Sequence, residues 1–82
     1  MRGSLLYATV HRMQVNGEVL RTIREQSGYS LSECARQADV SKAMLSEVER
    51  GIKNPSPPLV KRLAAALGVS IADLLETEEV VA

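Results

Sequence analysis

The chain has 82 residues, with ten lysines and arginines, ten aspartates and glutamates, and a formal net charge of zero. This length indicates one small domain, and the single cysteine, Cys34, excludes an intramolecular disulfide. Because there is also only one histidine, a conventional zinc site is nearly excluded. We therefore expect a packed core, with dimerisation as a further source of stability, and no metal, cofactor or small-molecule ligand.

The charges are distributed unevenly along the chain. Four of the ten acidic residues lie from Asp73 onward, where there is no lysine or arginine, so residues 1–72 carry ten basic against six acidic groups, a net charge of +4. A mildly basic body permits DNA binding without demonstrating it, because plain surface helices often carry such a charge. The first residues contain no apolar run long enough for a signal peptide or a transmembrane helix, which with the unpaired cysteine predicts a cytoplasmic location.

The pattern of residues 1–15 is the least informative in the chain and fits either an N-terminal arm or a short strand. Their apolar and β-tolerant residues alternate, whereas Arg2, His11 and Arg12 suit an arm in a DNA minor groove. A partly ordered terminus is the plainer interpretation. A strand here would need a partner, most simply another copy of the chain, which makes this segment a candidate dimer interface.

Residues 16–27 are expected to form the first helix. Asn16 is a suitable N-cap, Leu20 and Ile23 belong to an apolar stripe at helical spacing, and Gly28 stands where a helix commonly ends.

Two short capped helices are expected between Ser30 and Gly51. Ser30 and Glu33 form a capping-box pattern, Asp39 can adopt the left-handed turn, and Ser41 caps the following helix, which runs to Arg50. Five residues are expected to face the core: Cys34, Ala35, Ala38, Leu45 and Val48.

A proline-rich loop and two further helices complete the expected domain. Three prolines stiffen the segment before a helix that starts near Pro57 or Pro58 and stops at Gly68. Ser70 then caps a last helix over 71–76, and residues 77–82 form an acidic and apolar tail. The sequence thus predicts an all-α domain of five helices over residues 16–76.

A capped helix, a tight turn and a second capped helix with a polar outer face describe a helix-turn-helix. In this motif the first helix lies across the phosphate backbone and the second enters the major groove. Many helical hairpins bind nothing, so the pattern alone leaves the function open.

Two runs resemble a known family. GYSLSECARQADVSKAMLSEVERGIKNPS and LVKRLAAALGVSIADLL are similar to the lambda-repressor-like, or Cro/repressor, helix-turn-helix family, also called the xenobiotic-response-element family. The resemblance covers about Val19 to Leu75. Its most specific parts are the VS…LS..ERG run, the asparagine–proline pair after it, and LAAALGVS.

The resemblance implies a role for individual residues. The residues implied to read bases are Lys42, Ala43, Met44, Ser46 and Glu47. Those implied to bind phosphates are Ser30, Ser32, Ser41, Lys53 and Asn54. Lys42 can donate to guanine, Glu47 can accept from cytosine, and Ala43 or Met44 can contact a thymine methyl. Arg24 and Glu49 match a structural salt bridge between the first and third helices.

Two residues depart from the family pattern. Leu31 replaces a common glutamine at the first position of the second helix, so a phosphate contact should be missing and Leu31 becomes a surface or interface residue. Glu47 stands where neutral or basic residues are frequent. It either sharpens base choice or pairs with Arg50 on the helix surface.

The resemblance implies a sequence-specific DNA-binding transcriptional regulator from a prokaryote or phage. The expected form is a Cro-like or minimal repressor that binds double-stranded DNA as a homodimer, with half-sites about one helical turn (~34 Å) apart. Its dimer interface is expected either in the N-terminal arm or around the last helix. The alternative is an antitoxin or another protein-interaction module that also represses its own operon. The chain contains no nucleophile with a base and no plausible pair of catalytic carboxylates, so an enzyme is not expected.

Overall fold

The computed structural model describes residues 14–75, which contain five helices and no strand. The helices are α2 (Gly17–Gln26), α3 (Leu31–Gln37), α4 (Lys42–Glu49), α5 (Pro57–Leu67) and α6 (Ile71–Leu74). The predicted all-α, five-helix architecture is confirmed. Three helices end one or two residues earlier than predicted, because the last turn of a helix is the part that pattern and propensity define least.

Polar caps fix where the helices begin. The Asn16 side chain accepts from the backbone N–H groups of two residues in the first turn of α2, and the Ser41 hydroxyl accepts from Met44 in α4. Ser30 with Glu33 and Ser70 with Asp73 form capping boxes at α3 and α6. These contacts satisfy N–H groups that have no partner inside a helix.

Left-handed residues reverse the chain after the helices that precede them. Asp39 has φ 57° and Gly51 has φ 79°. After α4, the Ile52 N–H donates to the Glu47 carbonyl and the Gly51 N–H donates to the Val48 carbonyl, which is a Schellman motif. At Asp39 an aspartate adopts the left-handed conformation that glycine would adopt without a steric cost, as the sequence predicts.

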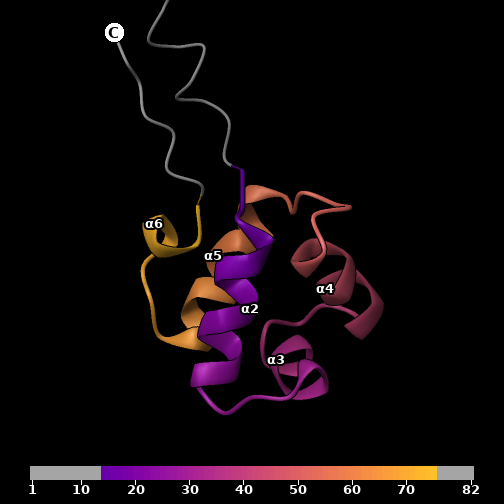
Figure 1. Ribbon diagram of the computed structural model, residues 1–82, viewed down its shortest axis with the longest axis vertical. Coiled ribbons are helices and arrows are strands. Elements are labelled where there is room, and N and C mark those ends of the chain that lie inside the picture. The colour runs from indigo at the N-terminus through magenta and orange to yellow at the C-terminus, as the bar shows by residue number, and fades with distance from the viewer. Residues whose placement is uncertain (1–13, 76–82) are drawn as a thin grey trace, which may run out of the picture.

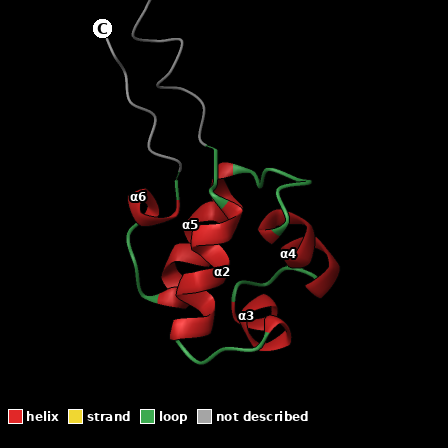
Figure 2. Cartoon of the chain, in the orientation of Figure 1, coloured by secondary structure: helices red, strands yellow, loops and turns green. Residues whose placement is uncertain are grey.

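The helices surround one small core. Figure 1 shows α2 and α5 at the centre, α6 on one side, and α3 and α4 on the other. Figure 2 shows that loops alone join them, the longest being the proline-containing segment between α4 and α5. The core is made mainly of aliphatic side chains: Val15, Leu20, Cys34, Ala35, Ala38, Leu45, Val48, Leu59, Val60, Leu63, Ala64, Leu67 and Leu74.

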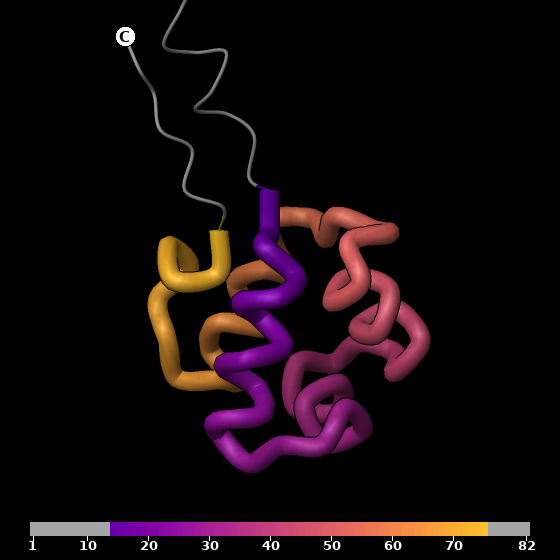
Figure 3. The backbone as a smooth tube through the Cα atoms, viewed as in Figure 1, coloured from indigo at the N-terminus to yellow at the C-terminus, as the bar shows by residue number. Residues whose placement is uncertain are grey.

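The two ends of the described chain lie together (Figure 3). Val15 forms an isolated antiparallel bridge with Leu75, and the Asn16 N–H donates to the Leu74 carbonyl at 2.9 Å. Val15 is also buried in the core. The extended chain at Val15 therefore pairs with the extended residue that follows α6 in the same chain. A strand in this segment was predicted to pair most simply with another copy. The rest of the predicted arm, residues 1–13, and the tail, 77–82, lie outside the described residues.

Candidate nucleic-acid interface

A shallow groove of about 540 Å³ runs along the outer face of α4. It is lined by Leu31 from α3 and by five residues of α4 and its C-cap: Lys42, Ala43, Ser46, Glu47 and Arg50. Their spacing of one, three or four residues places them on one side of a helix. Four of the five predicted base-reading residues therefore share one surface.

Met44 is the predicted base-reading residue that does not line this groove. Its side chain is half-buried and packs against the core. It follows Lys42 by two positions, about 200° around the helix axis, and so points away from Lys42, whereas Glu47, three residues later, is its neighbour on the helix surface.

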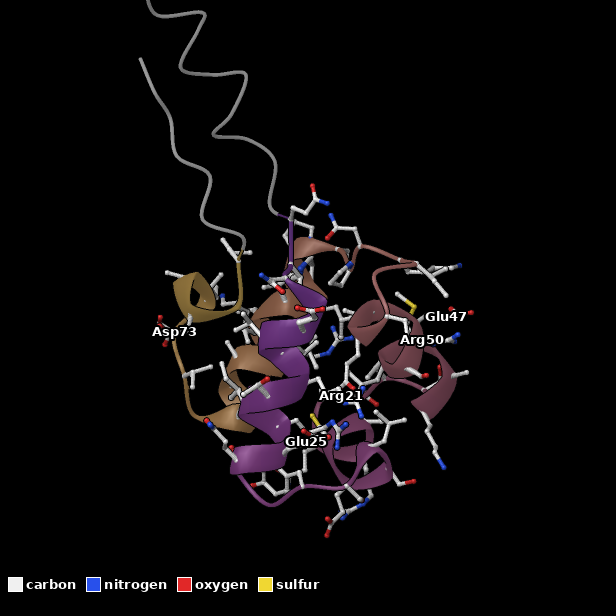
Figure 4. All side chains as sticks on the ribbon, in the orientation of Figure 1. Arg21, Glu25, Glu47, Arg50 and Asp73 are labelled. Carbon is white, nitrogen blue, oxygen red and sulfur yellow. The ribbon has the colours of Figure 1, made fainter. Side chains whose placement is uncertain are left out.

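The charged groups at the groove have no partner within the described chain. The ion pairs of residues 14–75 join Arg21 to Glu25 and Arg24 to Glu49, so the alternative pairing of Glu47 with Arg50 is not formed. Both residues lie on α4 at the edge of the molecule, opposite Asp73 on α6 (Figure 4). Arg50 is exposed and was not among the predicted site residues, although its place three residues after Glu47 could have identified it.

Two of the three serines predicted to bind phosphates, Ser30 and Ser41, are helix N-caps. The Ser30 hydroxyl accepts from the Glu33 N–H and donates to the Glu33 carboxylate at 3.3 Å. The Ser41 hydroxyl accepts from the Met44 N–H at 3.0 Å, which leaves its proton able to donate to a phosphate oxygen. Ser32 is exposed on the first turn of α3. Ser41 and Ser32 are therefore better placed for phosphate contacts than Ser30.

Lys53 and Asn54 lie in the loop after α4 but differ in their contacts. Lys53 is exposed, and its backbone N–H donates to the Glu47 carbonyl, which ties this part of the loop to α4. The Asn54 side-chain oxygen accepts from the Val15 N–H at 3.1 Å. Asn54 thus has a structural role that local sequence could not reveal, since its partner is 39 residues away.

Two features of α2 fix the position of α4. The Arg24 guanidinium donates to Glu49 through Nε at 2.6 Å and Nη2 at 3.0 Å, and its Nη1 donates to the Tyr29 carbonyl at 2.9 Å. The Glu49 side chain is 6% exposed. At the other end of α2, a Cβ on Gly17 would overlap the backbone carbonyl oxygens of Val48 and Glu49. Gly17 therefore permits a close approach of the two helices.

The pKa shifts of Arg24 and Cys34 are consistent with their buried positions beside Glu49. The hydrogen bond that Arg24 donates to the Glu49 carboxylate raises the pKa of Arg24, although burial acts in the opposite direction. Burial raises the pKa of the Cys34 thiol, and the nearby Arg24 opposes that shift. A buried thiol with a raised pKa is a poor nucleophile, which supports the expected core role of Cys34.

Arg62 is a structural residue that the sequence did not indicate. From α5 its Nε donates to the Ala38 carbonyl at 2.8 Å, and its Nη2 approaches the Asp39 carbonyl at 3.4 Å. Arg62 thereby satisfies backbone groups at the turn between α3 and α4. Only the folded chain brings these residues together, because they are more than 20 positions apart.

Among residues 14–75 there is no cluster of three acidic, histidine or cysteine side chains that could hold a metal ion. In the same range no helix has the length and apolar character required to cross a membrane.

Comparison with known proteins gives consistent matches. A family model described as helix-turn-helix matches residues 20–74. The HTH-type transcriptional regulator SinR of Bacillus subtilis is 41% identical over 61 residues, which are 73% of this chain and 55% of SinR. SlrR of the same species, also an HTH-type transcriptional regulator, is 38% identical over 63 residues, 76% of this chain and 41% of SlrR. The chain thus spans about half the length of these curated relatives.

Solved structures share the fold as well. The crystal structure of SinR, the master regulator for biofilm formation, in complex with DNA has a TM-score of 0.66 and 40% identity, covering 68% of this chain and 90% of that chain. The restriction-modification controller protein C.AhdI from Aeromonas hydrophila has a TM-score of 0.70 and 30% identity, covering 72% and 89%. Together with the family model, these matches show that the chain belongs to the lambda-repressor-like helix-turn-helix family.

Proposed function

We propose that this chain is a sequence-specific DNA-binding transcriptional regulator that inserts α4 into the major groove of double-stranded DNA. The observation that carries the proposal is the groove along α4, where Lys42, Glu47 and Arg50 present charged groups without an ion-pair partner among residues 14–75. Unpaired donors and acceptors on one helix face are what direct reading of base edges requires.

Individual contacts follow from side-chain chemistry. Lys42 donates to the acceptors of guanine, Glu47 accepts from the amino group of cytosine, and Ser46 serves either purpose. Ala43 contacts a thymine methyl. Arg50 joins this set because it lines the same groove. We assign to Met44, which neighbours Glu47 and packs partly against the core, the support of α4 as its main role.

Phosphate contacts hold the protein in register without reading sequence. Ser41 and Ser32 donate from the starts of α4 and α3, and Lys53 supplies a positive charge from the loop after α4. Asn54 and Ser30 contribute mainly by fixing the local backbone, since their side chains bond within the chain.

We further propose that the protein acts as a homodimeric repressor on a two-fold operator in the bacterial cytoplasm. One copy of α4 touches only a few base pairs, so two copies are needed for high specificity. The relatives support the class of function: SinR and SlrR are named as transcriptional regulators, and SinR has been crystallised with DNA. SinR has also been solved in a complex with the SinI protein. For this reason binding to a protein partner is the second candidate function of this chain.

Selection of bound duplexes from a random DNA pool, followed by mass measurement of the complex, tests this function. The expected result is a reproducible site with two-fold symmetry, occupied by two protein chains. A pool that remains random after repeated selection would contradict sequence-specific binding. A unique site without symmetry, occupied by one chain, would contradict only the dimer.

A further inference from the structure

Leu31 is an apolar residue at the edge of an otherwise polar surface. It is the first residue of α3, follows the N-cap Ser30, and is half-buried against the core. Its remaining surface lines the groove beside Lys42, Ala43 and Glu47. The groove therefore has an apolar wall next to its charged groups.

Such a wall cannot serve a phosphate. A leucine has no hydrogen-bond donor, and facing an anion it would displace water without replacing the lost hydrogen bonds. Among the features that base edges present in the major groove, the apolar one is the 5-methyl group of thymine. A methyl group removed from water against Leu31 contributes about as much as other buried methyls.

We propose that Leu31 is a specificity-determining residue that, with Ala43, contacts the 5-methyl group of a thymine in each half-site. The proposal rests on the major-groove binding proposed above. Leu31 contacts the methyl group from α3, and Ala43 contacts it from the first turn of α4. The methyl group then lies between the two helices. Glu47 and Lys42 read the neighbouring bases.

The thymine methyl can be removed without changing any hydrogen bond. The experiment measures the affinity of the full chain for its selected duplex and for duplexes in which one thymine at a time is replaced by deoxyuridine. One position in each half-site is expected to lose affinity by about fourfold, the value of one buried methyl. In the Leu31→Ala variant this loss should become smaller at the same position, because only the Ala43 contact with the methyl group is left.

Two further variants serve as controls. Leu31→Met keeps an apolar side chain of similar volume and should retain the deoxyuridine effect. Ile71→Ala removes a half-buried apolar residue that also follows a capping serine, at the first position of α6. This control should keep the effect, because α6 lies on the other side of the molecule (Figure 1).

Two results would overturn the inference. The first is specific binding with no position sensitive to deoxyuridine. The second is an unchanged deoxyuridine effect in Leu31→Ala, in which the variant loses the same affinity on thymine and deoxyuridine duplexes. That result would mean that Leu31 does not contact the methyl group. A wild-type chain without any preferred site would instead overturn the proposed function together with this inference.

Discussion

The side chains of Arg24 and Glu49 are both almost inaccessible to solvent, and their ion pair is reinforced by a hydrogen bond to the Tyr29 carbonyl. Removing one member of a buried pair leaves an uncompensated charge. Glu49→Ala is therefore expected to reduce the free energy of unfolding by about 3–5 kcal/mol, measured by urea denaturation.

The exposed ion pair of Arg21 with Glu25 is the matched control. Its side chains are 64% and 54% exposed, and an exposed pair four residues apart contributes at most about 0.5 kcal/mol. Glu25→Ala should thus change stability little. Similar losses for Glu49→Ala and Glu25→Ala would contradict a buried structural role for the Arg24–Glu49 pair.

Cys34 makes stability depend on pH in the alkaline range. Burial raises its pKa above the ordinary thiol value of 9.0, so the unfolded chain loses this proton first as the pH rises. The contribution of Cys34 is fully present below the unfolded-state pKa and is lost as the pH rises through the folded-state pKa. Denaturation at several pH values should show a fall in stability above about pH 9 that is smaller in Cys34→Ala. Parallel curves for the two proteins would contradict this account.

At single residues, the sequence predicted features that depend on neighbours along the chain. The capping roles of Asn16 and Ser41 and the left-handed conformation of Asp39 follow from local chemistry. The contacts of Asn54 and Arg62 could not be predicted, because their backbone partners come from distant segments. For Met44 the sequence left both a groove-facing and a half-buried side chain open, because that choice depends on how α4 packs against the core.

Between elements, the approach of α2 to α4 depends on the absence of a side chain at Gly17. Gly17→Ala is expected to force the start of α2 away from the end of α4, because the added Cβ would meet backbone carbonyls that cannot rotate aside. Overpacking of this kind costs about 1–3 kcal/mol, which should lower the thermal midpoint by several degrees.

A matched alanine substitution separates this contact from helix propensity. Thr22 is exposed in the middle of α2, and Thr22→Ala should be neutral or slightly stabilising because alanine is the better helix former. If Gly17→Ala behaved like Thr22→Ala, the close helix contact would not be required for stability.

The five elements were predictable because four of them begin with a capping side chain, α5 begins with two prolines, and apolar residues recur along them at helical spacing. The pairing of Val15 with Leu75 was not predictable, since an isolated bridge between the two ends of the domain leaves no periodic pattern in either segment. The place of Leu31 in the groove also needed the structure, because its position depends on how α3 packs beside α4.

Because the whole molecule has a net charge of zero, its electrostatic attraction to DNA depends on where individual positive charges lie. Lys53 is exposed in the loop after α4, and a lysine that neutralises one phosphate adds about one unit to the salt dependence of binding. Lys53→Ala should weaken binding to every duplex and make the plot of log affinity against log salt shallower by about 0.9.

Arg21→Ala removes the same charge from a side chain that is paired with Glu25. This control should leave the salt slope close to that of the wild-type protein. A Lys53→Ala slope equal to the wild-type slope would remove Lys53 from the phosphate contacts, and a loss confined to one DNA sequence would assign it to base reading.

Base reading by the outer face of α4 can be measured directly as the base-preference profile of Glu47→Ala. Affinities would be determined for the selected site and for every single-base change within it, with Asp73→Ala on the opposite side of the molecule (Figure 4) as the control. Glu47→Ala is expected to lose its preference at one or two adjacent positions in each half-site, by about 1–3 kcal/mol, while Asp73→Ala keeps the wild-type profile. A Glu47→Ala profile identical to that of the wild-type protein at every position would show that Glu47 does not read bases.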